Sequence, residues 1–293
     1  MSQVLTVCLI TYNHEKYIAQ AIESILMQKT TFDWELVIAD DCSKDATRDI
    51  ILKYKEQNPN KIKLIFQEKN VGPAQNFIDL ITSPRSKYIA YLEGDDYWTD
   101  EFKLQKQVDV IIKNKDCVIV YHNSKLIDSD NKTLLESYLT EFYKKNYTEL
   151  ELMQGAHIIS GTILFKNVLT IFPDEYINAF NGDTFFISLL GNFGNGIYLD
   201  ESMSNYRKHE NGVWNQYNEI KKYENSLESY KLMRNYYSRL ENKNLVQYFE
   251  NQIKLFNFFI KKSKCKKSND YSCLLFKLKE NLKSFKKSNK KVY

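Results

Sequence analysis

Short apolar runs alternate with amphipathic stretches through the first hundred residues of the chain. Four runs have the length of a strand and end at a polar or glycine-containing break, at residues 4–10, 34–39, 62–66 and 88–92. Three stretches between them place apolar side chains three and four residues apart, as a helix does, at residues 17–26, 50–54 and 77–81. We expect Asn13 to cap the first of these helices. Strands and helices that alternate over short links predict an α/β fold, a mostly parallel sheet with helices on both faces.

The pattern becomes less regular after residue 100 and changes near residue 215. Further strands are expected at residues 117–121, 158–165 and 196–199, and helices at residues 101–113 and from Asn181 onward. After Trp214 the chain contains neither glycine nor proline. Apolar residues at positions 245, 249, 253, 256 and 260 keep the spacing of an amphipathic helix. We therefore predict an α/β domain over residues 1–215 and a helical extension over residues 216–293.

Length, cysteine content and charge narrow the class of protein. The 293 residues suit one large domain with an appendage. No apolar run is long enough to cross a bilayer and the strand pattern starts directly after Met1, so we expect neither a membrane span nor a secretory signal. Five scattered cysteines without CxxC spacing are typical of the reducing cytoplasm and predict no zinc site. The net charge of +4 is uneven, because residues 261–293 hold twelve lysines against two acidic residues and residues 1–260 carry −6.

Acidic side chains gather where two of the predicted strands end. They are Asp40 and Asp41 after the second strand, and Glu93, Asp95 and Asp96 after the fourth. Open α/β sheets bind ligands at the carboxyl ends of their strands. Crowded carboxylates there need a cation, and oxygen ligands favour Mg²⁺ or Mn²⁺. Gly94 lets the backbone turn or a ligand approach closely. The alternative is a solvated acidic turn after a strand.

Two phosphate-binding signatures are missing from the sequence. Neither GxGxxG nor GxxxxGK(S/T) follows any predicted strand, and the chain has only nine glycines. This excludes the dinucleotide oxidoreductases and P-loop enzymes that depend on those loops. A bound diphosphate would need another source of positive charge, and the acidic strand ends indicate a bridging metal ion.

Four separated segments, in this order, resemble the inverting glycosyltransferases of family 2, which have the nucleotide-sugar-binding GT-A fold. The segments are Thr11-Tyr12-Asn13, Asp40-Asp41-x-Ser43-x-Asp45, Glu93-Gly94-Asp95-Asp96 and Asn181-Gly182-Asp183. The later loop Tyr206-Arg207-x-His209-x-x-Gly212-Val213-Trp214 is also similar to the family's. Each motif is short, but their order and spacing together are specific. The resemblance covers residues 4–215.

The resemblance implies a binding site for a nucleotide-sugar donor, with a UDP-sugar favoured. Its donor-binding positions here are Thr11, Tyr12, Asn13, Asp40, Asp41, Asn76, Glu93, Asp96 and Arg207. Thr11 and Tyr12 would line the pocket for base and ribose, and Asp41, with Asp40, would accept a hydrogen bond from uracil N3. Without the resemblance, these two acids would be read as a cap for the helix that starts near Ser43, and Asn76 as an exposed polar residue of a helix.

The Glu93-x-Asp95 pair stands at the family's DXD position, whose last acid ligates the metal. Asp95 is therefore expected to bind Mn²⁺ or Mg²⁺, with Asp96 beside it against the donor sugar. Glu93 departs from the family pattern, so it is expected at the ribose, at the sugar or in no contact. A neutral His209 imidazole can complete the metal's ligands, and Arg207 could meet the leaving diphosphate with two hydrogen bonds. Alternatively, His209 is a loop histidine that does not bind the metal.

Asp183 matches the family's general base, although here Gly182 stands where the family often has an acid. An inverting displacement needs one carboxylate to take the proton of the acceptor hydroxyl, and partial burial would make that carboxylate a stronger base. The alternative is that Asp183 only caps a helix. Ser160, Trp98 and Trp214 are candidate acceptor contacts, although a tryptophan near a pocket is often part of the core.

Partners follow from the resemblance and from the charge of the tail. The acceptor is expected to be a glycan or lipid-linked saccharide of surface polysaccharide synthesis. The basic tail could bind the anionic inner face of the membrane, which makes a peripheral cytoplasmic enzyme, or it could be a solvated end. No nucleic-acid module is recognisable, and the oligomeric state is not indicated.

Two other functions were weighed. A sugar-1-phosphate nucleotidyltransferase would need a glycine-rich signature with a basic residue after the first strand, which Thr11-Tyr12-Asn13 does not provide. A non-catalytic sugar-binding or scaffold protein should have lost the acid at position 95 or 183, and both are present.

Overall fold

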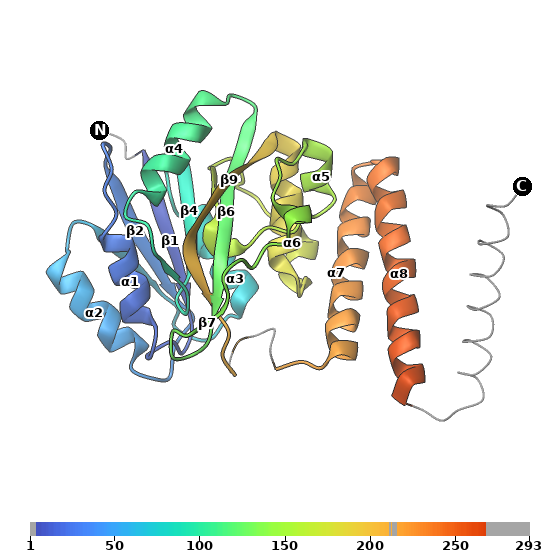
Figure 1. Cartoon of the computed structure of the whole chain (residues 1–293), viewed down its shortest axis with the longest axis horizontal. Coiled ribbons are helices and arrows are strands. Elements are labelled where there is room, and N and C mark those ends of the chain that lie inside the picture. Colours follow the sequence, from blue (N-terminus) through green and yellow to red (C-terminus); the bar gives the residue numbers. More distant parts are fainter. Residues whose placement is uncertain (1–3, 211, 213–215, 268–293) are drawn as a thin grey trace, which may run out of the picture.

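A single mixed sheet runs through the molecule, with helices on both sides (Figure 1). The computed structural model describes residues 4–210, 212 and 216–267. Within them the strands lie in the order β3 (Ile62–Phe66), β2 (Trp34–Asp40), β1 (Leu5–Thr11), β4 (Tyr88–Glu93), β8 (Leu164–Lys166), β6 (Cys117–Ile127), β9 (Asn195–Arg207) and β5 (Tyr97–Trp98), and β7 (Thr133–Leu135) pairs with β6. The predicted α/β fold is confirmed.

Strands β1 to β4 form a parallel half whose two faces are both buried. Alternate residues of β1 point to opposite sides: Leu5, Val7 and Leu9 pack under α1 (Ile18–Leu26), α2 (Thr47–Gln57) and α4 (Lys103–Lys113), whereas Cys8 faces the other core. That second core is covered by α3 (Pro73–Thr82), α5 (Glu149–Met153) and α6 (Gly182–Leu190). Strands covered on both faces read as continuous apolar runs, which is the pattern seen in the sequence.

The other half of the sheet is mixed, and here the sequence predictions were less accurate. The predicted strand at 158–165 is wrong in its first part, because Ser160–Thr162 forms the 3₁₀ turn η2 and β8 starts only at Leu164. Since η2 lies at the carboxyl end of β4, β8 leads away from that end and pairs with β4 antiparallel. The strand predicted at 196–199 extends as β9 to Arg207, paired with β6.

The helix cap predicted at Asn13 is also wrong. Helix α1 begins at Ile18 and its N-cap is Tyr17, after a turn in which the Tyr17 and Ile18 amides donate to the His14 carbonyl. Asn13 has a positive φ of 55° and instead joins two loops, because its Oδ1 accepts from the Lys44 amide at 2.8 Å.

Two antiparallel helices, α7 (Glu219–Arg239) and α8 (Lys243–Lys267), extend the molecule at one end (Figure 1). Helix α7 packs on α6 and on the 3₁₀ turn η3 (Asp174–Asn178), and the ring of its Tyr237 stacks on Phe249 of α8 with centroids 5.7 Å apart. The helix predicted from the spacing of residues 245–260 is thus present. The predicted boundary at residue 215 and the tail beyond residue 267 lie outside the described residues.

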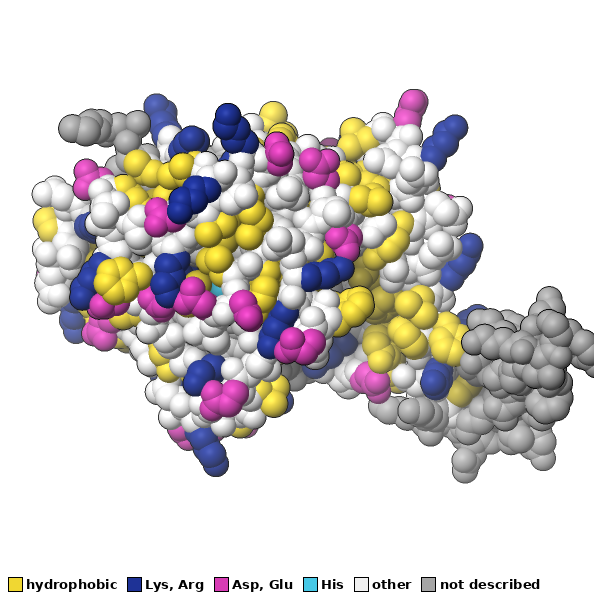
Figure 2. All heavy atoms as spheres, turned by 45° about the horizontal axis from the view of Figure 1, so that its top comes forward, with side chains coloured by type: hydrophobic (Ala, Val, Ile, Leu, Met, Phe, Trp, Pro, Cys, Tyr) yellow, Lys and Arg dark blue, Asp and Glu magenta, His cyan; other side chains and the backbone are white. Residues whose placement is uncertain are grey.

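No helix among the described residues combines the length and the apolar composition that crossing a bilayer requires. On the face shown in Figure 2, basic and acidic side chains are interspersed over the sheet domain, so that face has no broad region of one charge.

Candidate active site

The carboxyl ends of β1, β2 and β4 meet at one edge of the sheet, as parallel pairing requires. Thr11 at the end of β1 lies opposite Asp40 of β2, and the preceding residue, Ile10, lies opposite Glu93 of β4. Three of the sequence motifs therefore converge because their strands are in register. This edge is where open α/β sheets bind ligands.

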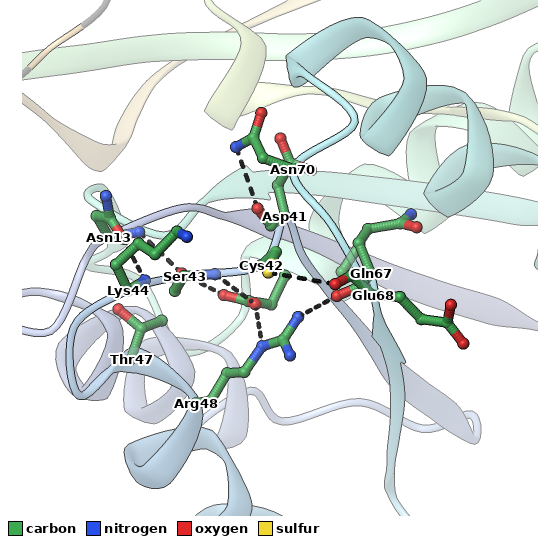
Figure 3. A network of polar contacts seen from close by, with 12 residues as sticks. Asn13, Asp41, Cys42, Ser43, Lys44, Thr47, Arg48, Gln67, Glu68 and Asn70 are labelled. Carbon is green, nitrogen blue, oxygen red and sulfur yellow. Dashed lines mark hydrogen bonds and ion pairs between the residues drawn. The ribbon is translucent and has the colours of Figure 1, made fainter.

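Asp40 is wholly buried and fixes the turn after β2. Its partners Ser43 and Arg48 are labelled in Figure 3. Its carboxylate accepts hydrogen bonds from the Ser43 amide at 3.0 Å and from the Ser43 hydroxyl, and it forms an ion pair with Arg48 of α2. Arg48 in turn donates to the Gln67 carbonyl at 2.6 Å, which ties the turn to the end of β3. Neither Asp40 nor Asp41 caps α2: its N-cap residue is Ala46, and the preceding Asp45 accepts from the Thr47 amide at 3.0 Å.

Asp41 is also buried, but it faces the loop before α3. Its two carboxylate oxygens accept from the amides of Val71, at 2.7 Å, and Gly72, at 3.0 Å. Burial raises the pKa of Asp41, and these two amides partly oppose the rise. Asn76 is 1% exposed and reaches the Ala39 carbonyl at 3.4 Å, so its reading as an exposed helix residue is wrong.

The turn between β4 and β5 leaves no room for a side chain at position 94. A Cβ on Gly94 would lie 2.7 Å from Thr11 Oγ1 and 2.8 Å from His14 Nδ1. Those two atoms are themselves 3.1 Å apart and hydrogen-bonded. Thr11 is thereby buried and engaged, whereas Tyr12 and Asn13 are exposed at the surface of the site. Gly94 therefore sets how closely the acidic turn approaches the first motif.

Asp95 lies between two histidines. Its Oδ2 is 2.9 Å from His209 Nε2 and 3.9 Å from His14 Nε2. Burial alone would raise the pKa of Asp95, but the His209 hydrogen bond and the nearby imidazoles lower it overall, which keeps it an anion. The predicted pair Asp95 and His209 is thus brought together. No role was predicted for His14, although its position directly after the first motif was the available signal.

Asp95 and His209 form part of a possible metal site. Within the described residues no three histidine, cysteine or acidic side chains are arranged to hold a metal ion. Asp95 and His209 supply one carboxylate and one imidazole in contact. That set fits a cation such as Mg²⁺ or Mn²⁺, which commonly takes one or two protein ligands and completes its shell with substrate phosphates and water. It does not fit a cage made of protein ligands alone.

Arg207 is buried and turned into the protein. Its amide donates to Asp96 Oδ1 at 2.7 Å and its Nε to the Asp95 carbonyl at 2.8 Å. Its terminal nitrogens donate to oxygens of Gln20 and Asn131, each within 3 Å, and to two backbone carbonyls. These contacts leave the guanidinium facing protein oxygens, which argues against the diphosphate contact expected for it. Arg207 instead holds the acidic turn.

A hollow of about 810 Å³ opens beside His209. Its walls come from the loops after β1, β2, β6 and β9, and they carry Lys16, Lys44 and Lys208 together with four acidic residues. The sequence motifs gave no role to these lysines.

Glu93 lies close enough to Asp95 and to Asp183 for the charges of both to act on it. Burial raises its pKa to about 8, with further contributions from the charges of Asp95 and Asp183, while a hydrogen bond from the Ser160 side chain opposes the rise. Gly161 packs against both acids, since a Cβ there would lie 3.5 Å from Glu93 Oε2 and 3.5 Å from Asp96 Oδ2. Ser160 thus belongs to the site.

Acceptor contacts were predicted for Trp98 and Trp214, and the structure describes only the first. Trp98 is 1% exposed, and its indole donates to the Gly161 carbonyl at 2.8 Å. A ring enclosed in the core offers no face to a sugar, so the acceptor contact predicted for Trp98 is corrected to a support for the turn at Gly161. Trp214 lies outside the described residues.

Asp183 stands in the first turn of α6, and Asn181 is the N-cap, so the capping alternative for Asp183 is wrong. Its Oδ1 accepts from the Thr184 amide at 2.7 Å, and its side chain is exposed on the open side of the site. Crowding by protein atoms still raises its pKa, against the Thr184 amide and the nearby His157. Asp183 is thus an accessible carboxylate with more proton affinity than an ordinary one.

Known proteins resemble this chain in sequence. The sequence profile described as "Glycosyl transferase family 2" matches residues 6–168. Proteins of Mycobacterium tuberculosis and Mycobacterium bovis whose names assign no activity are 30% identical over 210 residues, which is 72% of this chain and 60% of theirs. The Escherichia coli protein named UDP-Glc:alpha-D-GlcNAc-diphosphoundecaprenol beta-1,3-glucosyltransferase WfgD is 30% identical over 128 residues, 44% of this chain and 48% of that protein.

Solved structures share the fold at low identity. The Staphylococcus aureus TarS fragment 1–349 in complex with UDP-GlcNAc has a TM-score of 0.61 at 20% identity and covers 80% of this chain and 66% of its own. The mannosyltransferase PcManGT of Pyrobaculum calidifontis, in complex with GDP-Man and Mn²⁺, has a TM-score of 0.54 at 13% identity and covers 97% and 81% of the two chains.

Proposed function

Since this chain belongs to glycosyl transferase family 2, we propose that it transfers a sugar, with inversion, from a UDP-sugar to a saccharide acceptor in polysaccharide synthesis. The observation that supports the proposal is that the charges of two acids act on the buried Glu93: Asp95, which contacts His209, and the accessible Asp183. The first acid offers charge for a diphosphate, and the second offers a base for an acceptor. Proteins similar to this chain use or bind nucleotide sugars, according to their names and titles.

The transfer needs one proton acceptor and one stabilised leaving group. Asp183 takes the proton from an acceptor hydroxyl, whose oxygen forms a bond to the anomeric carbon of the donor sugar. The bond from that carbon to the diphosphate oxygen breaks, and its electron pair leaves with the nucleoside diphosphate. Attack opposite the leaving group inverts the configuration. The raised pKa of Asp183 makes it a better base near neutral pH.

Asp95 and His209 would hold a divalent cation, Mn²⁺ or Mg²⁺, which when bound supplies positive charge at the diphosphate. The chain's own contribution to the leaving group is the set of lysines beside His209, at positions 16, 44 and 208. Arg207 acts behind them by holding the Asp95–Asp96 turn in place. At the base, Asp41 offers lone pairs beyond those that accept from Val71 and Gly72, and Tyr12 is exposed beside it.

Calorimetric titration of UDP, GDP and TDP, each with Mn²⁺ and with EDTA, tests this proposal. We expect UDP to bind tightest, and only in the presence of the metal. Equal affinity for the three diphosphates would refute the UDP assignment, and equal affinity in EDTA would refute the metal. Absence of any nucleotide binding would favour the non-catalytic reading.

We also propose that the basic tail brings the enzyme to an anionic membrane that carries a lipid-linked acceptor. Its first lysines, 261, 262 and 264, are exposed at the end of α8. Each lysine near such a surface contributes about 1 kcal/mol. Removing residues 261–293 should therefore weaken cosedimentation with vesicles containing phosphatidylglycerol at low salt, and leave phosphatidylcholine vesicles unbound in both forms. Unchanged sedimentation would refute the role.

A further inference from the structure

Three ring-bearing side chains beside the acidic turn have no part in the donor site described above. Tyr138 follows β7, His157 follows α5, and Tyr206 lies near the end of β9. The Tyr138 and Tyr206 rings meet edge to face with centroids 5.2 Å apart, and the Tyr138 and His157 centroids are 6.4 Å apart. These three residues, the aromatic wall, therefore form one continuous surface from three separate segments.

The aromatic wall spans the distance between the acidic turn and the base. Tyr206 directly precedes Arg207, whose amide is bonded to Asp96. At the other end, His157 is close enough to Asp183 for the two charges to interact. Tyr138 lies between Tyr206 and His157, since its ring centroid is 5.2 Å from that of Tyr206 and 6.4 Å from that of His157. The wall thus borders the space between Asp96 and Asp183, into which an acceptor hydroxyl must come.

The backbone that carries the central ring of the wall is held in place by hydrogen bonds. Asn123, 5% exposed in β6, accepts from the Leu139 amide at 2.9 Å and donates to the Ser137 hydroxyl at 2.7 Å. The Tyr138 amide between them donates to the Ser124 carbonyl at 2.8 Å. Tyr206 is fixed by its pairing with Leu126 across β6 and β9. Because the backbone at both tyrosines is already ordered, a ligand that packs on their rings causes a smaller loss of conformational entropy.

The rings are also partly open to solvent. Tyr138 and Tyr206 are half-buried and His157 is exposed, whereas a purely structural cluster would be enclosed. Burial raises the pKa values of both tyrosines, so their hydroxyls stay protonated and can donate hydrogen bonds. Half-open aromatic rings with polar tips match a pyranose ring, which has an apolar C–H face and a rim of hydroxyls.

We propose that the aromatic wall is the acceptor subsite and receives a pyranose, packed against the rings of Tyr138 and Tyr206 and with one hydroxyl beside Asp183. The proposal rests on the proposed function, since it needs Asp183 to be the base. It commits the acceptor's reacting end to a sugar ring, and it separates that ring from the nucleotide half of the site.

The test uses the full chain and defined probes, because the natural acceptor is unidentified. Saturation-transfer NMR is recorded with the methyl glycosides of glucose, galactose, mannose and N-acetylglucosamine in the presence of UDP and Mn²⁺. We expect transfer to the ring-face protons of at least one glycoside. In Tyr138→Ala and Tyr206→Ala that signal should fall by about fivefold or more. Tyr138→Phe and Tyr206→Phe should restore most of it, because the ring is retained.

Matched controls separate the possible results. Phe142→Ala removes an aromatic ring from the same segment that is 73% exposed and outside the wall, and should leave the signal unchanged. UDP affinity, measured by calorimetry, should stay within about twofold of wild type in every variant, which also verifies folding. No glycoside signal in the wild type, or an undiminished signal in both alanine variants, would overturn the proposal. Loss of UDP affinity in step with the glycoside signal would assign the wall to the donor instead. Failure of the wild type to bind UDP would refute the proposed function separately.

Discussion

The two sides of the site are built differently. On the donor side, Thr11, Asp40 and Glu93 are neighbours because parallel strands put them in register, and most of their contacts join adjacent loops. On the acceptor side, Asp183 comes from a helix, and Tyr138 and His157 come from irregular segments far apart in the chain. The donor side is a consequence of secondary structure and strand pairing, whereas the acceptor side depends on how later segments pack around the mixed half of the sheet.

The electrostatics of the two sides differ in the same way. Asp95 is held as an anion by two histidines, which suits a group that must carry charge. Asp183 is pushed toward its protonated form by its surroundings, which suits a group that must take up a proton. Because the surroundings shift the pKa values of these two carboxylates in opposite directions, we expect donor binding and sugar transfer to be separable by mutation.

The largest effect is expected from Asp183→Asn. The amide cannot accept the proton, so kcat should fall by about 10²- to 10⁴-fold. UDP affinity should be unchanged, because Asp183 lies outside the donor side. Asp49→Asn, an exposed acid on α2, is the control and should keep wild-type turnover. If Asp183→Asn turned over at the wild-type rate, the assignment of the base would be wrong.

Asp95→Ala should have the complementary effect. Removing one of the two expected ligands should weaken Mn²⁺-dependent UDP binding by about 10- to 100-fold. Weak binding in EDTA should be the same in variant and wild type. Calorimetry of both proteins under both conditions measures the difference. A metal-dependent affinity equal to that of the wild type would show that the cation is held elsewhere.

The pH dependence should include an acid limb that reports the base, distinct from the titration of Glu93, whose pKa is raised to about 8. Asp183 is active only when unprotonated, and burial raises its pKa above the ordinary value of an aspartate. The kcat should therefore be complete at high pH and be lost as pH falls through that raised pKa, at a higher pH than an ordinary aspartate would give. The residual activity of Asp183→Asn should lack this acid limb. An identical limb in that variant would assign it to another group.

The smallest effect is expected from Asp41→Asn on the donor side. One oxygen that accepts from Val71 or Gly72 becomes an NH₂ group facing an N–H donor. An unsatisfied buried group of this kind costs about 1–3 kcal/mol of the free energy of unfolding. Urea denaturation should show the loss, together with weaker UDP binding and unchanged kcat at saturating donor. Wild-type stability would mean that these bonds can be replaced by water.

The sequence by itself determined the parallel half and its edge. Apolar runs ending in polar motifs predicted where β1, β2 and β4 stop. Because these strands pair in parallel, their ends and the motifs that follow them lie side by side. It also indicated Asp95 with His209, since both stand in recognisable motifs. The aromatic-rich amphipathic pattern after residue 240 was sufficient for α8.

Only the tertiary structure decided which side chains of these segments are free to act. Trp98 and Arg207 read as ligand contacts. Trp98 is instead enclosed in the core, where it supports the turn at Gly161, and Arg207 is hydrogen-bonded to the acidic turn. His14 and Tyr138 had no motif and were brought to the site by a loop turn and by the Asn123 contacts. A sequence pattern records burial along one element, whereas exposure at a site depends on what packs across from it, and that is set by contacts between distant segments.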